Sequence, residues 1–340
     1  MIVQLASRVV SSLLAVIGAS IVSFLLLRIA PSNPATLILG QFASQEAIDN
    51  LTEEIGLEKP IWTQYWNYIS GFVRGDWGYS YSLGTDVRSL LGAKLPATIE
   101  LGLYAFVFAF VGALVLALLA TYRRRPLVDG GVRGLSFLGL GIPPFWFGLM
   151  SLVLLSEGLG WFPGPDGRLD SGVAPPRDIT GLYTLDALVT GNWAAFGDAL
   201  WHLVLPAITL GLAPMGFLLR LLRANLLDVS REPFLLVVRS KGISRWTAFA
   251  RHALPNAFLP TLTAAGLVLG QLLAGSVLVE KVFNWPGAGA LVTDGILRQD
   301  FTTVQAFILL SAFVYVIVNL LVDIASAAID PRIRAPRSVG

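Results

Sequence analysis

The sequence contains no cysteine, only two histidines and few charged residues. Of its 340 residues, 14% are Asp, Glu, Lys or Arg, whereas 55% are hydrophobic. The lack of cysteine excludes a disulfide framework and any metal site built on thiolates. Such a low charge content could not solvate the surface of a soluble domain, which indicates a protein with several membrane spans.

Histidine and lysine are too scarce for most catalytic chemistry. We expect His202 at the outer start of a span and His252 in the cytoplasm, so they cannot form one metal site or serve one catalytic triad. A nucleotide-binding P-loop needs a lysine between Gly and Ser or Thr, and no lysine has these neighbours. We therefore expect no catalytic residue, metal, cofactor or nucleic-acid partner for this chain.

Six apolar runs are long enough to cross a bilayer, because about 20 helical residues span a hydrocarbon core of about 30 Å. They cover Val9–Leu27, Leu101–Tyr122, Val132–Leu155, Trp201–Leu222, Ala257–Val279 and Val304–Val322. The first run is too long for the apolar core of a cleavable signal peptide, so we interpret it as a retained helix. The sequence thus predicts an all-α integral membrane protein with six transmembrane helices.

Basic residues gather on one side of this topology. The N-terminus, the second and fourth connections and the C-terminus together hold 15 of the 24 basic residues and 5 of the 22 acidic ones. By the positive-inside rule, both termini and the connection after the fourth run face the cytoplasm. The acidic loops then face outward.

The predicted spans divide the chain into four parts. These are a first transmembrane helix (1–30), an extracytoplasmic helical segment (31–96), a five-helix core with a cytoplasmic hairpin at 224–256 (97–335), and a cytoplasmic tail (336–340).

The outer segments contain one clear helix and two features with open interpretations. Ser44–Leu57 is amphipathic, with Ser44 as its expected N-cap. The aromatic cluster that follows, at 62–68, suits either an interfacial belt or a surface that docks an external partner. Segment 156–200 is either an ordered loop over an opening or a spacer.

The cytoplasmic hairpin is basic and sharply bent. Pro233 can begin its first helix, Gly242 can adopt the left-handed conformation that ends it, and Ser244 can cap a second short helix whose pattern ends at Pro255. An apolar face and a basic border then suit either anionic headgroups or a socket on a cytoplasmic partner.

This hairpin resembles a known motif. Gly242, eleven residues, then Leu254–Pro255 has the spacing of the EAA motif of ABC-importer permeases. The string RSKG…RHALPN is similar to its version in dipeptide, oligopeptide and nickel importer permeases, and most like their B-type subunit. Further strings follow in the order of that family: FLLLRIAPSNPA, IGLEKPIWTQYW, RGDWGYSYS, KLPATIELG, LGIPPFWFG, HLVLPAITLGL and GSVLVEKVFNWPGAGALV. One departure is Leu236–Val238, which replaces Glu-Ala-Ala and favours a hydrophobic seat for the hairpin.

The resemblance implies a type I ABC importer permease in a bacterial cytoplasmic (inner) membrane. It further implies a heterodimer with a second homologous permease, two ATPase subunits that bind ATP and Mg, and an extracytoplasmic solute-binding protein. The hairpin would contact an ATPase through Phe234, Val237, Val238, Arg239, Lys241, Gly242, His252, Leu254, Pro255 and Asn256. We expect di- or oligopeptides as cargo, with a nickel chelate or glutathione as alternatives. A secondary carrier and a membrane-anchored scaffold are the rival functions.

The fifth run has a small face and a few polar positions. Gly266, Gly270 and Ala274 repeat every four residues, which permits close packing of either the partner permease or a neighbouring span. Gln271, Ser276 and Glu280 are candidate residues of the translocation pathway.

Overall fold

The computed structural model describes residues 2–29, 34–39, 44–54, 56–123 and 126–329, and most of this part of the chain is helical, apart from turns and one long loop over 159–182. A short antiparallel ladder pairs β1 (Tyr79–Ser80) with β2 (Thr85–Asp86). The helices are α1 (Ile2–Ile29), α2 (Pro34–Leu39), α3 (Gln45–Glu54), α4 (Ile61–Arg74), α5 (Val87–Arg123), α6 (Pro126–Gly141), α7 (Pro144–Ser151), α8 (Tyr183–Thr190), α9 (Trp193–Val229), α10 (Pro233–Ser240), α11 (Arg245–Ala248), α12 (Leu254–Leu273), α13 (Val277–Val282), α14 (Ala288–Leu297) and α15 (Phe301–Ile329). The predicted tail, 336–340, lies outside the described residues.

Long apolar helices confirm an all-α membrane protein. Within the described residues, 4 helices are long and apolar enough to cross a bilayer, and a bent pair raises the number to 5. The 4 helices lie at Val87–Tyr122, Trp193–Val229, Arg245–Leu273 and Phe301–Ala325. In addition, α1 contains a shorter apolar stretch, Val10–Leu25.

The third predicted span, Val132–Leu155, is wrong as a single straight helix. Instead, α6 ends at Gly141, and α7, extended by a π-helical turn over Leu152–Gly158, leaves it at an angle of 104°. The cause is the Pro143–Pro144 pair, because proline lacks the amide donor that a helix interior needs and forces the preceding residue into an extended conformation.

The second arm of the hairpin does not end at Pro255. Instead α11 continues through a π-helical turn, Phe249–Ala253, into α12 as one helix. In that turn the amide of Leu254 donates to the carbonyl of Phe249. Proline has no amide hydrogen to donate to a helix. Because the π-helical turn is wider and Pro255 lies at the start of α12, the helix continues without needing a hydrogen bond from Pro255. At its other end α12 stops at Leu273, so the predicted fifth span Ala257–Val279 is too long.

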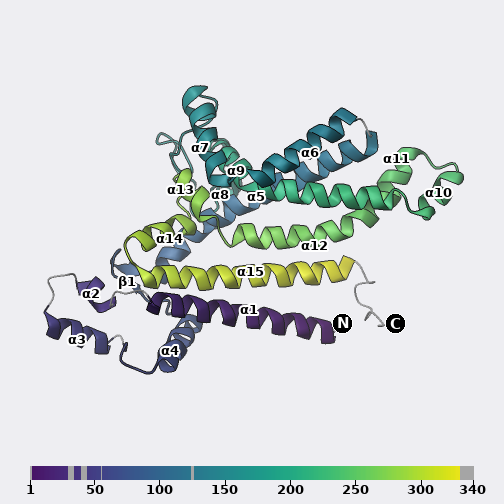
Figure 1. Ribbon diagram of the computed structural model, residues 1–340. Coiled ribbons are helices and arrows are strands. Elements are labelled where there is room, and N and C mark those ends of the chain that lie inside the picture. Colours follow the sequence, from purple (N-terminus) through teal and green to yellow (C-terminus); the bar gives the residue numbers. More distant parts are fainter. Residues whose placement is uncertain (1, 30–33, 40–43, 55, 124–125, 330–340) are drawn as a thin grey trace.

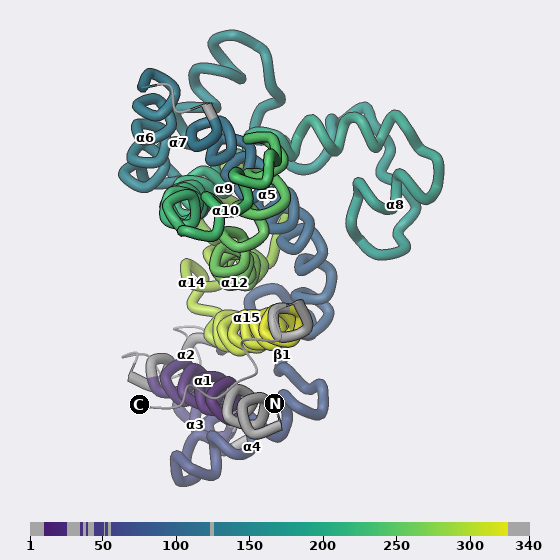
Figure 2. The backbone as a smooth tube through the Cα atoms, turned by 90° about the vertical axis from the view of Figure 1, so that its right-hand side faces the viewer, coloured from purple at the N-terminus to yellow at the C-terminus, as the bar shows by residue number. Residues whose placement is uncertain are grey.

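The spans lie in a row (Figures 1 and 2). From one edge to the other the order is α6, then α9 with α5, then α12, α15 and α1. The contact between α5 and α9 is tight because α5 presents alanines at every fourth position, Ala105, Ala109, Ala113 and Ala117, all buried. A side chain at Gly211 of α9 would meet the carbonyl oxygen of Ala105.

The small face of α12 packs inside the chain. A Cβ atom added at Gly266 would clash with Val322 of α15, and one added at Gly270 would meet Asn319 and Tyr315 of the same helix. The sequence left open whether this face packs on the partner permease or on a neighbouring span. In the structure it packs on a neighbouring span, α15.

The segment between α1 and α5 is attached to the spans by tyrosines. Tyr65 of α4 lies within hydrogen-bond distance of Ser20 of α1, at 2.7 Å, and Tyr68 donates to the carbonyl of Gln305 in α15 at 3.3 Å. Burial raises the pKa of Tyr68 well above its ordinary value, with a further contribution from Tyr65. The predicted cap of α3 is present, since Ser44 Oγ accepts from the amide of Ala47.

Candidate functional site

The hairpin has the predicted backbone conformation. Its first helix, α10, begins at Pro233, Gly242 has φ +79°, and Ser244 Oγ accepts from the amide of Thr247 at 3.2 Å. The left-handed turn at Gly242 directs α11 away from α10, and glycine adopts it without the steric cost that a side chain would add. The two arms therefore meet at a defined angle.

The tip of the hairpin is apolar and uncovered by the described part of the chain. Leu235 is only 3% exposed and anchors α10 on the helical core, whereas Phe234, Leu236 and Val237 are 38%, 66% and 55% exposed. Trp246 of α11 is 54% exposed. Of the three positions that replace Glu-Ala-Ala, Leu236 and Val237 are therefore exposed and Val238 is half-buried, and together they give the tip an apolar surface.

The second arm is attached to the end of α5 through Tyr122. Its ring makes edge contacts with Trp246 at 5.0 Å between centroids and lies 5.7 Å from the Arg245 guanidinium, which also donates to the carbonyl of Tyr122. Because Tyr122 lies far from the hairpin in the sequence, no local pattern pointed to this contact. The hairpin is therefore held by two spans, α5 and α12.

Arginines line a hollow beside the hairpin. The hollow has a volume of about 670 Å³ and is bordered by Asp129, Arg133, Arg223, Arg231, Arg239 and Arg245. Arg133 and Arg223 both pair with Asp129, at 2.5 Å each. Since one acid faces five arginines, the hollow is strongly positive and suits an acidic partner surface.

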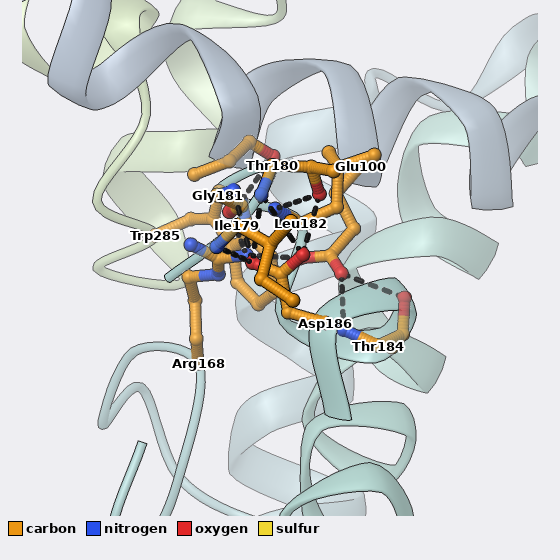
Figure 3. A network of polar contacts seen from close by, with 10 residues as sticks. Glu100, Arg168, Ile179, Thr180, Gly181, Leu182, Thr184, Asp186 and Trp285 are labelled. Atoms are coloured by element: carbon orange, nitrogen blue, oxygen red, sulfur yellow. Dashed lines mark hydrogen bonds and ion pairs between the residues drawn. The ribbon is translucent and has the colours of Figure 1, made fainter. Parts of the chain in front are cut away.

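At the opposite end of the spans, a buried ion pair fixes the long loop over 159–182, named the outer loop after the side of the membrane that the sequence predicts for it. Glu100 of α5 accepts from Arg168 Nη2 at 2.5 Å, and from the amide and the hydroxyl of Thr184 at 2.7 Å each (Figure 3). The Arg168 guanidinium also lies 3.5 Å from the ring centre of Tyr183 and donates to the carbonyl of Gly181. Within segment 156–200, the loop before α8 is thus held against α5 by specific contacts.

A second carboxylate holds the turn before α8. Asp186 is 1% exposed and accepts from the amides of Ile179, Thr180 and Gly181. Burial alone would raise the pKa of Asp186, but these hydrogen bonds and one from the Thr180 hydroxyl outweigh it and hold the pKa below its ordinary value.

Comparison with known proteins identifies the family. Residues 109–335 match the family model described as "Binding-protein-dependent transport system inner membrane component", and residues 1–102 match the model of its N-terminal part. The chain belongs to this permease family. It is an inner-membrane component of a transport system and is not itself an enzyme.

Several relatives align with the permease over nearly its whole length. The "Probable D,D-dipeptide transport system permease protein DdpB" of Escherichia coli K12 is 39% identical over 320 residues, 94% of each chain. The "Dipeptide transport system permease protein DppB" of the same strain is 36% identical over 322 residues, 94% of each chain. The "Oligopeptide transport system permease protein AppB" of Bacillus subtilis 168 is 35% identical over 327 residues, 96% of the permease and 97% of the relative.

The candidate pathway residues of the permease lie in different surroundings. Gln271 is exposed on α12, and Ser276 precedes α13 with no side-chain capping bond. Glu280 is fully buried, and its two oxygens accept from the Thr98 hydroxyl at 2.8 Å and from the amide of Ala290 at 2.9 Å. Burial raises the pKa of Glu280, and its carboxylate caps the N-terminus of α14.

The remaining predicted coupling residues of the permease lie on both arms, at the end of α10 and at the start of α12. Asn256 donates to the carbonyl of His252 at 2.7 Å, Leu254 is half-buried and Pro255 is exposed. Arg239 borders the arginine hollow, and Lys241 is exposed at the end of α10. The structure therefore divides the predicted set into an exposed apolar tip and a basic, partly buried stem.

A cavity beside the outer loop, named the outer cavity after that loop, carries both signs of charge. It has a volume of about 520 Å³ and lies where the outer loop faces α13 and α14. Its charged lining residues are Lys94, Asp166, Arg168, Asp170, Glu280, Lys281 and Asp294. Sequence analysis could not assemble this cavity, because its lining comes from three separate parts of the chain.

Proposed function

We propose that this permease is one half of the membrane path of an ATP-driven importer for di- or oligopeptides. The observation that supports this cargo is the full-length similarity to permeases named for dipeptide and oligopeptide transport. In this proposal the path has six spans per permease. A second homologous permease completes it, two ATPase subunits supply energy from ATP and Mg, and a solute-binding protein delivers the peptide.

The proposed orientation places both termini and the hairpin in the cytoplasm. The helices of the row run side by side. The beginning of α1, the end of α15 and the hairpin all lie at the same ends of these helices, on the right in Figure 1. The arginine hollow lies at this end as well. The positive-inside rule assigns such an end to the cytoplasm, and the outer loop and cavity then face the solute-binding protein.

The hairpin is the proposed contact with an ATPase subunit. Its exposed apolar tip, Phe234, Leu236 and Val237, would fill an apolar socket, and the arginines beside it would face acidic groups at the rim. Because α11 is continuous with α12, a displacement of the second arm reaches a span without an intervening loop. Nucleotide-driven closure of the ATPases would therefore reorient the outer cavity.

The outer cavity supports a zwitterionic cargo. A peptide carries an ammonium group and a carboxylate at its two ends, and both signs of charge line the cavity. Burial of either end without a partner would be costly. In this proposal Glu280 acts as a positioning residue that holds α14 against the cavity, while Gln271 and Ser276 border the path.

Co-expression with the partner permease and both ATPases tests the proposal. Val237→Asp places a charge on the exposed tip and should abolish peptide-stimulated ATP hydrolysis and uptake of a labelled dipeptide, with insertion unchanged. The matched control is Leu127→Asp, which alters another exposed apolar residue, 91% exposed, at the start of α6. Equal coupling in the two variants would remove the role of the tip.

A second variant tests the angle between the arms. Proline cannot adopt the φ of +79° found at Gly242 and lacks the amide that donates to the carbonyl of Arg239. Gly242→Pro should therefore uncouple ATP hydrolysis from uptake, and Gly242→Ala should do so partially. Uptake driven by an ion gradient in the isolated permease would instead establish a secondary carrier, and uptake of glutathione or a nickel chelate without competition from dipeptides would refute the peptide cargo.

A further inference from the structure

Three potential metal ligands meet where the outer loop lies on the first turns of α9. Asp198 and His202 are one turn apart on α9, and Asp170 comes from the loop. Asp170 Oδ1 is 3.4 Å from His202 Nε2, and Asp198 Oδ2 is 3.7 Å from His202 Nδ1. One ligand atom from each residue lies within 4.8 Å of the others.

The His202 ring is buried with one nitrogen unsatisfied. Its side chain is 1% exposed, and Nδ1 lies 2.9 Å from the backbone carbonyl oxygen of Asp198. A carbonyl only accepts hydrogen bonds, so Nδ1 carries the proton and Nε2 of the neutral ring presents a lone pair. Within the described residues, Nε2 has no hydrogen-bond partner.

The surroundings of this lone pair indicate that a positive charge belongs beside it. Nε2 lies 3.4 Å from the Asp170 carboxylate oxygen, and when the ring carries a single proton, on Nδ1, both of these atoms are acceptors. Two acceptors at this distance repel each other unless a cation or a proton lies between them, and a buried polar atom without a partner is costly.

We propose that this cluster binds a divalent transition-metal ion, with Zn²⁺ as the representative. Bonds of about 2.0–2.2 Å from zinc to nitrogen and oxygen place neighbouring ligand atoms about 3.2–3.6 Å apart in a tetrahedral site, which the 3.4 Å separation of His202 Nε2 and Asp170 Oδ1 matches. Asp170 is 62% exposed, so its side chain can rotate and adjust its own oxygen to an ion held between His202 and Asp198. The imidazole ligand favours such a metal over Ca²⁺ or Mg²⁺, which select oxygen.

The surroundings also suit a metal site. Ligating histidines usually donate their second ring N–H to a carbonyl or carboxylate, as Nδ1 of His202 does to the carbonyl of Asp198. The amide of Asp170 donates to Asp198 Oδ2 at 2.8 Å and holds that carboxylate in place. Asp170 also lines the outer cavity, which gives an ion a route to the site.

A bound ion would fasten the outer loop to α9. The loop is tied to α5 by Arg168 and Glu100 and to α9 by the hydrogen bond from the Asp170 amide to Asp198. The metal would strengthen the attachment to α9. Extracytoplasmic metal would then stiffen the cover of the cavity. This inference does not depend on the cargo or on the ATPase partners.

Metal titration of the purified full-length permease in lipid nanodiscs tests the site. Co²⁺ gives visible absorption bands when it binds nitrogen and oxygen ligands, and it should quench Trp201, which is next to His202 in sequence and stacks on Phe162 at 4.7 Å. We expect saturable uptake of about one Co²⁺ per chain, displaced by Zn²⁺. Loss of one ligand in Asp170→Asn should weaken binding at least about tenfold, since even outer-shell partners contribute about 10–100-fold.

The matched control is Asp166→Asn, which removes another exposed acid of the same loop and the same cavity lining. Its affinity should equal that of the unmodified permease. His202→Gln should abolish binding, but a change of this buried ring can also disturb the fold. The variant Asp170→Asn, at an exposed residue, therefore decides the test. The absence of saturable uptake, or equal affinity in Asp170→Asn and the unmodified permease, would overturn the proposal and leave a proton on His202 as the occupant of the gap.

Discussion

The buried ion pair between Glu100 and Arg168 allows the sharpest quantitative prediction. The side chains of Glu100 and Arg168 are 2% and 8% exposed. Glu100→Gln removes the negative charge and leaves the guanidinium buried without a counter-ion. Breaking a buried pair in this way costs about 3–5 kcal/mol, and here it acts on the attachment of the outer loop to α5.

Hydrogen exchange measures this loss locally. The amide of Thr184 donates directly to Glu100, and the neighbouring amides 179–181 are held by Asp186. A loss of about 3 kcal/mol raises the population of the open loop by about two orders of magnitude, since about 1.4 kcal/mol corresponds to a factor of ten. Peptides covering 179–186 should therefore exchange about 100-fold faster in Glu100→Gln.

Two further variants show whether the pair itself is responsible. Arg177→Met removes an exposed arginine of the same loop and should leave exchange unchanged. The double variant Glu100→Gln with Arg168→Met should cost less than the sum of the single changes, because it leaves no unpaired charge. Additive effects, or unchanged protection of 179–186 in Glu100→Gln, would refute the assignment of the pair as the anchor of the loop.

Three other predictions concern packing, pH and capping. Gly266→Leu would clash with Val322 and should lower the melting temperature of the purified permease, while Gly18→Leu, where an added Cβ meets nothing within 4 Å, should not. Folding lowers the pKa of Asp186, so the stability that this carboxylate contributes is fully present above its ordinary pKa of 3.8 and is lost as the pH falls through the folded pKa. Protease cleavage at 179–186 should therefore rise only in this acidic range. An onset of cleavage near neutral pH would contradict this. Ser244→Ala removes the cap of α11 at a cost of about 1 kcal/mol, seen as faster exchange of the first α11 amides, and unchanged exchange would refute the capping role.

Local signals in the sequence predicted the hairpin well. Pro233, Gly242 and Ser244 each have one strong backbone preference, and each occupies the predicted position. The same kind of signal was present in the Pro143–Pro144 pair, but hydropathy alone joined the two sides of the break into one span. The apolar content of a segment measures its affinity for lipid and does not determine its direction.

The outer site could not be predicted because its contacts are long-range. Glu100 and Arg168 lie in different predicted segments, and a lone carboxylate at the end of a span suits an interfacial position equally well. His202 was compared only with the other histidine, so the two aspartates beside it were missed. Only the placement of the loop on α9 brings Asp170 to the ring.

The position of α1 has a consequence for biosynthesis. Its main neighbour is α15, and α4 adds contacts near its outer end (Figure 1). The ribosome therefore releases α1 long before it makes the helix on which α1 will rest. Until then the nascent α1 must remain in lipid without α15, and its Val10, Leu14 and Val22, each more than half exposed, give it apolar surface for that environment. A chain truncated before α15 would strand its first helix.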